Sequence, residues 1–142
     1  MKILIVEDDR RVRQMLQAQI LASARDKADI LLGSAESLAE ALEWMLENEP
    51  DLVICDGLFP IGTISERTFR NLSETQHWVV IWALALVNRK TFALLTGDAG
   101  ILARARAMGV AGFPKPEGVD AVIRYALGDQ GRKRSSGKPR KS

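Results

Sequence analysis

The stretch DLVICDGLFP, residues 51–60, is an apolar run that stops at a carboxylate, Asp56, with a proline four residues later. Its apolar residues follow one another without alternation, which is typical of a strand that helices cover on both faces. Strands of that kind belong to parallel sheets. The stretch therefore predicts a buried parallel strand that delivers an acidic side chain to one edge of the sheet.

Four further apolar runs have the same character, and amphipathic segments separate them. These runs are KILIV (2–6), ADILLG (28–33), TFALL (91–95) and VAGF (110–113). The alternation predicts an α/β fold, a doubly wound five-stranded parallel sheet of flavodoxin-like type with helices on both faces. We expect the strand order 2-1-3-4-5, in which the first and third strands flank the point where the order reverses.

Four apolar stripes at helical spacing predict helices between or after these runs. The stripes are Val12, Met15, Leu16 and Ile20; Leu38, Leu42, Met45 and Leu46; Ile101, Leu102, Ala105 and Met108; and Val119, Ile123, Ala126 and Leu127. Ser37 and Glu40 can form a capping box at the start of the second helix, and Pro50 follows its end. Gly109 follows the third of these stripes and marks a helix end.

The segment 61–90 is ambiguous, because WVVIWALALV (78–87) fits either a helix or a strand. It is about half the ~20 residues that span a bilayer. We interpret it as a largely buried third helix; the alternative is a strand here, with TFALL absorbed into the next helix. The single histidine, His77, lies at the edge of this run and is interpreted as a packing or capping residue. No glycine-based turn is expected after Pro60.

Composition limits the class of protein. The 142 residues, 46% apolar and 27% charged, fit one domain with a sizeable core. Cys55 is the only cysteine and lies inside an apolar run, which argues against a disulfide framework or a metal-binding cysteine spacing. The first apolar run is too short for a signal peptide. We therefore expect a cytoplasmic protein with no membrane contact.

The positive charge is concentrated at the carboxyl end. Residues 128–142 carry six basic residues, Arg132, Lys133, Arg134, Lys138, Arg140 and Lys141, against Asp129 alone. We expect a folded domain over 1–127 and a disordered basic tail over 128–142. The tail is either a solubilising end or an electrostatic contact with nucleic acid or an acidic partner. Without a helix-turn-helix or similar domain, nucleic-acid binding is the weaker hypothesis.

Acidic, hydroxyl and basic side chains follow the ends of four predicted strands. Glu7 and Asp8 follow the first strand, Asp56 the third, Thr96 the fourth and Lys115 the fifth. We expect them to converge, because the carboxyl ends of parallel strands meet at one edge. Clustered carboxylates repel one another unless a cation joins them, and Mg²⁺ prefers such oxygen ligands. The set therefore predicts a phosphoryl-transfer site in which Asp56 is the nucleophile.

The ordered set ILIVEDD, DLVICDGLFP, LLTGD and GFPKP resembles the receiver domains of two-component response regulators, which share the chemotaxis-regulator-like fold. The resemblance runs from about residue 1 to about residue 127. It implies a single-domain phosphorelay protein that accepts a phosphoryl group on Asp56 from a histidine kinase or phosphotransfer protein. Such a domain acts on a downstream protein target. It catalyses its own phosphorylation and dephosphorylation without being a conventional multiple-turnover enzyme.

The resemblance also implies individual roles. Mg²⁺ would be held by the carboxylates of Glu7, Asp8 and Asp56 and by the backbone carbonyl of Leu58. Thr96 and Lys115 would complete the catalytic set around Asp56, and Thr96 would also be the switch hydroxyl.

Three departures from the family pattern qualify these roles. The interval between Asp56 and Thr96 is long, and the position three residues before Lys115, where many receivers carry an aromatic switch, is Gly112. Phe113, one residue later, is the candidate that remains for this switch. The segment from Thr96 to Gly109 is short. A second hypothesis therefore stays open, a pseudo-receiver that acts as a phosphorylation-independent protein interaction module.

Single residues of the set also have structural interpretations. Glu7 and Asp8 can simply precede a helix that Asp9 caps, because acidic residues are favoured at a helix N-terminus. Asp56 can be a turn former. It is the combination of all positions in order that favours the phosphoryl-transfer site.

Overall fold

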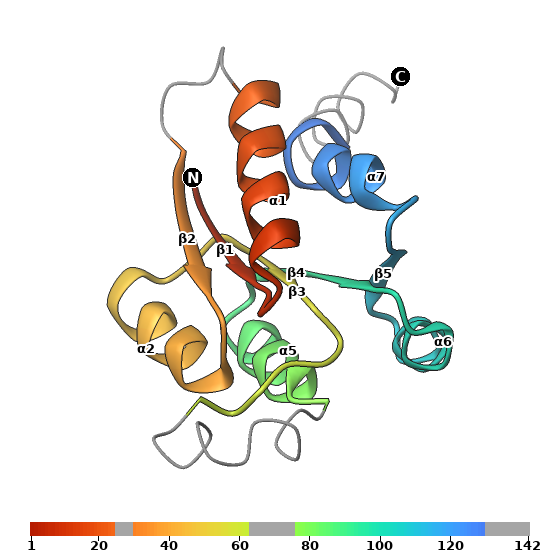
Figure 1. The fold of residues 1–142 in the computed structure, drawn as a ribbon. Coiled ribbons are helices and arrows are strands. Elements are labelled where there is room, and N and C mark those ends of the chain that lie inside the picture. The colour runs from red at the N-terminus through yellow and green to blue at the C-terminus, as the bar shows by residue number, and fades with distance from the viewer. Residues whose placement is uncertain (25–29, 63–75, 130–142) are drawn as a thin grey trace, which may run out of the picture.

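The structure, a computed structural model, describes residues 1–24, 30–62 and 76–129 as one sheet and its helices (Figure 1). The elements in chain order are β1 (Lys2–Val6), α1 (Arg10–Ser23), β2 (Leu31–Ala35), α2 (Leu38–Asn48), β3 (Leu52–Cys55), α5 (Trp78–Val87), β4 (Thr91–Thr96), α6 (Ala99–Ala107), β5 (Ala111–Pro114) and α7 (Val119–Ile123). A π-helical turn, η1 (Arg124–Asp129), continues α7.

The five strands form one parallel sheet in the order β2-β1-β3-β4-β5, which confirms the predicted fold class. Leu4 of β1, for example, pairs with Gly33 on one side and Val53 on the other. The second strand starts at Leu31 and runs to Ala35, later than the expected 28–33. β2 is one of the two edge strands, and Leu31 is half exposed there.

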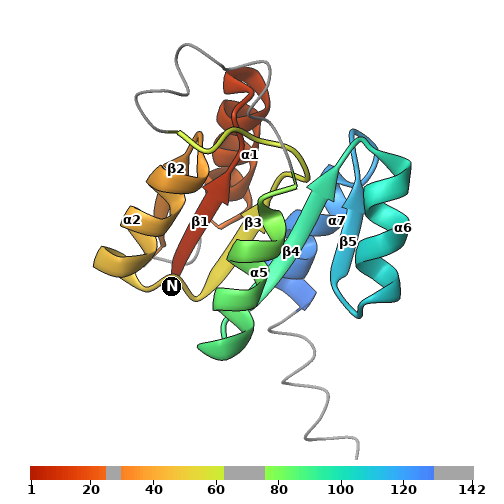
Figure 2. The same ribbon diagram turned by 90° about the horizontal axis from the view of Figure 1, so that it is seen from below.

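Helices cover both faces of the sheet, with α1 and α7 on one face and α2, α5 and α6 on the other (Figure 1, Figure 2). The strands divide their side chains between two cores. In β1, Ile3 and Ile5 pack on the α1 and α7 side, while Leu4 and Val6 pack on the other side, and all four are fully buried. This two-sided burial explains why the strand sequences are continuously apolar.

The ends of the first two helices follow from side-chain capping. The Asp9 carboxylate accepts hydrogen bonds from the amides of Arg11 and Val12 and starts α1. The Ser37 hydroxyl accepts from the Glu40 amide at the start of α2. The capping box is incomplete, however, because the Glu40 carboxylate accepts from the Glu36 amide, one residue before the cap.

The loop after β3 is hydrogen-bonded to the first turn of α2. The carbonyls of Pro60 and Ile61 accept from the amides of Leu38 and Ala39, which satisfies first-turn donors of that helix. Gly62 has φ of 84°, and a Cβ at this position would overlap the Ser37 side chain. Residues 60–62 form no assigned turn and residues 63–75 lie outside the described residues, so the expected lack of a glycine-based turn after Pro60 stays a prediction. Gly62 fits because it has no side chain and tolerates positive φ.

Residues 78–87 form a helix, α5, so the alternative of a strand there is wrong. The expectation that this helix is largely buried is also wrong. Only Trp78, Ile81 and Ala85 are buried, whereas Leu86 is 62% and Val87 77% exposed. The sheet covers one side of the helix, and no described element covers the other.

Two residues of the predicted stripes also lie outside the core. Leu46 of α2 is 84% exposed, and Met108, which follows α6, is 42% exposed. Each is the last residue of its predicted stripe. Small residues of these helices, Ala41 and Ala105, are fully buried.

His77 precedes α5, and its ring lies against Phe59 with a centroid separation of 5.8 Å. The packing role predicted for this histidine is confirmed. The central part of the long Asp56–Thr96 interval, residues 63–75, and most of the predicted tail, residues 130–142, lie outside the described residues. Within the described ranges, each helix is too short or too polar to span a lipid bilayer.

Candidate functional site

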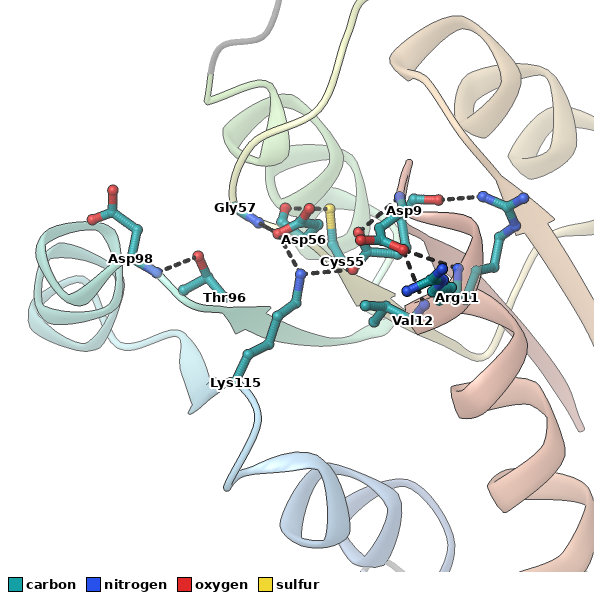
Figure 3. Close-up of polar contacts among 11 residues, drawn as sticks. Asp9, Arg11, Val12, Cys55, Asp56, Gly57, Thr96, Asp98 and Lys115 are labelled. Atoms are coloured by element: carbon teal, nitrogen blue, oxygen red, sulfur yellow. Dashed lines mark hydrogen bonds and ion pairs between the residues drawn. The ribbon is translucent and has the colours of Figure 1, made fainter.

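The predicted site residues converge at the carboxyl edge of the sheet, where the strands deliver them (Figure 3). Glu7 directly follows β1, Asp56 follows β3 and Thr96 ends β4. Backbone hydrogen bonds extend the sheet to these positions: the Asp56 amide donates to the Val6 carbonyl at 2.8 Å and the Lys115 amide to the Thr96 carbonyl at 2.9 Å. Their main chains are therefore fixed by the sheet itself.

Lys115 joins two of the carboxylates. Its Nζ lies 2.7 Å from Glu7 Oε1 and 3.1 Å from Asp56 Oδ1. Glu7 is almost fully buried, and Asp56 is 9% exposed. Buried carboxylates are stable only when they are paired or hydrogen-bonded, so the ammonium group compensates a charge that the fold has withdrawn from water.

The Asp56 side chain makes its described polar contacts through one oxygen. Oδ1 accepts from the Gly57 amide at 2.7 Å as well as from Lys115. Oδ2 takes part in neither bond. A carboxylate held in this way has a fixed orientation and a second oxygen that can act as a nucleophile.

Three carboxylates form a group suited to a hard cation. Oxygens of Glu7, Asp8 and Asp56 all lie within 4.8 Å of one another. Mg²⁺ is held in proteins by one or two carboxylates together with water and phosphate oxygens, so the residues present fit this ion. The proposed fourth ligand, the Leu58 carbonyl, belongs to a residue that is 37% exposed. Its role as a metal ligand stays a prediction.

The electrostatics of the group are those of crowded, buried acids. Burial, with a contribution from the Asp56 charge, raises the pKa of Glu7 from 4.5 to about 8, although Lys115 acts in the opposite direction. Burial alone would lower the pKa of Lys115, but Asp56 and Glu7 together raise it. A divalent cation among these oxygens would favour the ionised form of Glu7.

Cys55 lies beside Asp56 in sequence but has different chemistry. Its thiol is completely buried, and this burial raises its pKa well above the usual value. A thiol of that kind is inert because the thiolate is the reactive form. Cys55 therefore does not compete with Asp56 as a nucleophile.

Thr96 ends β4, and the strand that delivers Asp56, β3, lies between β4 and the strand that delivers Glu7, β1. Thr96 is 3% exposed, and its Oγ1 accepts from the Asp98 amide at 3.1 Å. Gly57 packs directly on it, since a Cβ at position 57 would lie 2.7 Å from Thr96 Oγ1. Gly97 is exposed, and the nearest atom to a Cβ at this position would be Lys115 Cβ at 3.9 Å, which leaves this side of the site accessible.

Sequence reasoning did not identify two residues that organise the site. Arg13 of α1 donates to the Glu7 carbonyl at 2.8 Å and pairs with Glu36 at 3.3 Å, so it ties β1 to the end of β2. Gly57 makes room for Thr96. The sequence does show a basic residue, Arg13, about one turn into the helix that follows Glu7 and Asp8. It does not show that Arg13 bonds to the Glu7 carbonyl, because that contact depends on the fold.

The candidate switch Phe113 lies on the opposite face of the sheet from Thr96. Phe113 pairs in register with Leu95, and its ring packs on Tyr125 at 5.5 Å within the core of α1 and α7. Gly112 is on the α6 side, where Leu102 Cδ1 would lie 2.8 Å from a Cβ at position 112. Direct contact between Phe113 and Thr96 is therefore not available, and a switch role for Phe113 stays a prediction.

Comparison with known proteins places this fold. No protein-family model matches the sequence, and no curated protein matches it. Among solved structures, the non-phosphorylated HemR receiver domain of Leptospira biflexa is similar at 23% identity and a TM-score of 0.57, over 81% of this chain and 82% of that one. A two-component transcriptional regulator, AraC, of Clostridium phytofermentans is similar at 19% identity and a TM-score of 0.62, over 88% of each chain.

The receiver domain of the Francisella response regulator 1452 is similar at 17% identity and a TM-score of 0.59, over 86% of this chain and 89% of that one. At such identities the likeness establishes the fold and not the activity. The strand order and the helices on both faces of the sheet agree with it. The chain has the receiver-domain fold.

Proposed function

We propose that this receiver fold accepts a phosphoryl group on Asp56 from a histidine kinase or phosphotransfer protein and signals to a downstream protein. The observation that supports this most is the position of Lys115 Nζ between Glu7 and Asp56, at 2.7 and 3.1 Å. A cation, three carboxylates and a buried hydroxyl at one sheet edge are the components that phosphoryl transfer requires. The proposal covers a receiver domain over 1–127 and a basic tail over 128–142.

In the proposed step, an oxygen of Asp56 attacks the phosphorus of the donor. A bond forms between that oxygen and phosphorus, and the bond from phosphorus to the donor nitrogen or oxygen breaks, with its electron pair leaving on the donor. The product is an acyl phosphate. The sheet fixes the orientation of Asp56 beforehand, so little of its freedom is lost in the reaction.

The charge that develops on the phosphoryl oxygens needs neutralisation. Glu7, Asp8 and Asp56, with the Leu58 carbonyl, would hold Mg²⁺, which supplies positive charge to those oxygens when bound. Lys115 supplies a second positive charge, and it would exchange part of its contact with Asp56 for the phosphoryl group. Thr96 would donate its hydroxyl to the same group, which couples the modified state to the loop before α6.

The alternative function, a phosphorylation-independent interaction module, is favoured by one observation. On the face of β5 that bears on α6, Gly112 offers no side chain, and Leu102 and Arg106 of α6 occupy the adjoining space. Arg106 also donates twice to the Gly112 carbonyl, at 2.9 and 3.3 Å. An aromatic side chain at position 112 would have no space to move between two conformations. A conformational response to phosphorylation would therefore have to use other residues.

Phosphorylation by a small donor tests the proposed function. Incubation with Mg²⁺ and acetyl phosphate should add one phosphoryl group to the intact mass, and hydroxylamine should remove it because acyl phosphates are mixed anhydrides. Asp56→Asn should gain none. Lys115→Ala should be labelled more slowly, whereas Thr96→Ala should still be labelled. A wild-type protein that stays unmodified under these conditions would support the interaction module instead.

A further inference from the structure

The helix α5 has a second apolar side that its own domain does not cover. WVVIWALALV contains no charged residue, yet burial is confined to the side of Trp78, Ile81 and Ala85. Val80, Leu84 and Val87, at spacings of four and three, are 42%, 37% and 77% exposed. A helix that is apolar all round is normally buried all round, so this side requires a partner.

The exposed side of α5 borders a groove that it forms with α2, its neighbour on the same face of the sheet (Figure 1). The groove holds about 510 Å³ and is lined by Leu42, Met45 and Leu46 of α2 and Leu84 of α5, with Glu49 and Lys90 among its polar residues. Leu46 is 84% exposed beside it. An apolar groove between two helices is the shape that receives an amphipathic helix.

The charged residues around the groove indicate which kind of partner would bind in it. Residues 36–51 carry six acidic residues and no basic one, namely Glu36, Glu40, Glu43, Glu47, Glu49 and Asp51. Glu43, Glu47 and Glu49 are exposed. A polar recess of about 430 Å³ adjoins the apolar groove, and three acidic residues, Glu47, Glu49 and Asp51, line it together with Lys2 and Lys90. The complement is therefore apolar on one face and basic along its edge.

A second copy of this chain fits less well. The apolar surface it could offer is another α5, in which Trp78–Val87 has no basic residue and only Arg89 and Lys90, beyond the end of the helix, could pair with the acids of α2. Those acids would face an uncharged helix and would lose water without gaining a partner. A basic amphipathic helix satisfies both the apolar groove and its acidic border.

We propose that the groove between α2 and α5 docks an amphipathic helix of a partner protein, with apolar residues at i, i+4 and i+7 and a lysine- or arginine-rich edge. The lining residues are near the carboxyl ends of both helices, which precede β3 and β4. The groove thus lies toward the amino edge of the sheet, and Asp56 lies at the carboxyl edge. Docking there goes beyond the proposed function and does not require phosphorylation.

The test uses a synthetic leucine–lysine peptide of about four helical turns, amphipathic in sequence. Controls are a scrambled peptide of the same composition and a leucine–glutamate peptide. Binding to the full chain is followed by calorimetry without Mg²⁺ or phosphodonor, so the result is independent of Asp56 chemistry. The amphipathic basic peptide should bind at least about tenfold more tightly than either control, and added salt should weaken it.

Matched variants locate the binding. Leu46→Ser with Leu84→Ser should weaken the basic peptide about tenfold or more, while Leu21→Ser, an exposed leucine on α1, should not. Glu47→Lys should also weaken it. Equal binding by the scrambled peptide, or unchanged binding by the double variant with a native circular dichroism spectrum, would overturn the proposal. So would sedimentation showing a dimer that the double variant abolishes, since a second copy would then fill the groove.

Discussion

At the scale of single residues, the sequence predicted which side chains meet but not how they are held. The site residues come together because each follows or ends a parallel strand, and the apolar pattern of the sequence predicts where the strands end. These residues are Glu7, Asp8, Asp56, Thr96 and Lys115. The contacts of Arg13 and Gly57 were not predictable, because they depend on packing between elements distant in sequence.

Glu7 should make stability depend on pH when divalent ions are removed with EDTA. Its pKa in the folded protein, about 8, is raised above the unfolded value of 4.5, so folding favours the protonated form. Its contribution is fully present below pH 4.5 and is lost as the pH rises through about 8. The elevated pKa of Lys115 lies above this window and leaves the trend unchanged.

Urea unfolding between pH 5 and pH 9 measures this effect. The wild-type free energy of unfolding should fall across the range, and Glu7→Gln, which cannot ionise, should flatten the decline. Added Mg²⁺ should flatten it as well, since the cation favours ionised Glu7. An identical decline in wild type and Glu7→Gln would assign the pH dependence to another group.

The two glycines beside the candidate site should respond differently to one added methyl group. A Cβ at position 57 would lie 2.7 Å from Thr96 Oγ1 and 3.1 Å from Ile101 Cγ2, whereas at position 97 the nearest atom is 3.9 Å away. Gly57→Ala should therefore destabilise the fold by about 1–3 kcal/mol and displace Thr96. Gly97→Ala should stay within about 0.5 kcal/mol of wild type in urea unfolding. Equal losses would mean that the packing around Thr96 is loose.

At the scale of helices and strands, apolar pattern gave the type of each element more reliably than its burial. The uniform apolarity of 78–87 could not show which side meets the sheet, and half of that surface is exposed. The capping box of α2 was predicted from spacing, but only the hydrogen bond to the Ser37 hydroxyl forms. The Glu40 carboxylate accepts from the Glu36 amide and not from the Ser37 amide. Local hydrogen bonds of this kind have several nearly equal solutions.

The end of α2 provides a test at this scale. Glu49 closes the helix with φ of 50°, in the left-handed region that disfavours residues with a side chain. Glu49→Gly should stabilise the protein by about 0.5–1 kcal/mol in thermal or urea unfolding. Glu43→Gly, inside the same helix, should instead destabilise it by about 1 kcal/mol. If both substitutions destabilise, the backbone at position 49 is not left-handed in solution.

At the scale of the whole molecule, the class and strand order of the fold were predictable because five continuous apolar runs alternate with helical stripes. The unequal coverage of the sheet faces by helices was not predictable, because it depends on which side of each helix packs against another element. The site lies at one edge of the sheet, and the groove between α2 and α5 lies toward the other.

Magnesium should stabilise the whole domain through the site at the carboxyl edge. A ligand that binds only the folded state adds about 2.7 kcal/mol at a hundredfold excess over its Kd. Mg²⁺ should therefore raise the melting temperature, and Asp8→Ala should abolish the increase. Asp8→Ala should also melt no lower than wild type without metal, because it relieves repulsion among the carboxylates. A rise with Mg²⁺ that is the same in both proteins would place the ion elsewhere.

We propose that Asp56, and no other carboxylate, receives the phosphoryl group. Reduction by borohydride converts an aspartyl phosphate, but not a free aspartate, into homoserine, and mass spectrometry of the resulting peptides locates that residue. After treatment with Mg²⁺ and acetyl phosphate, homoserine should appear at position 56 and should be missing when Mg²⁺ is replaced by EDTA. Homoserine at Asp8 or Asp98, or a phosphorylated protein without homoserine at position 56, would contradict the account.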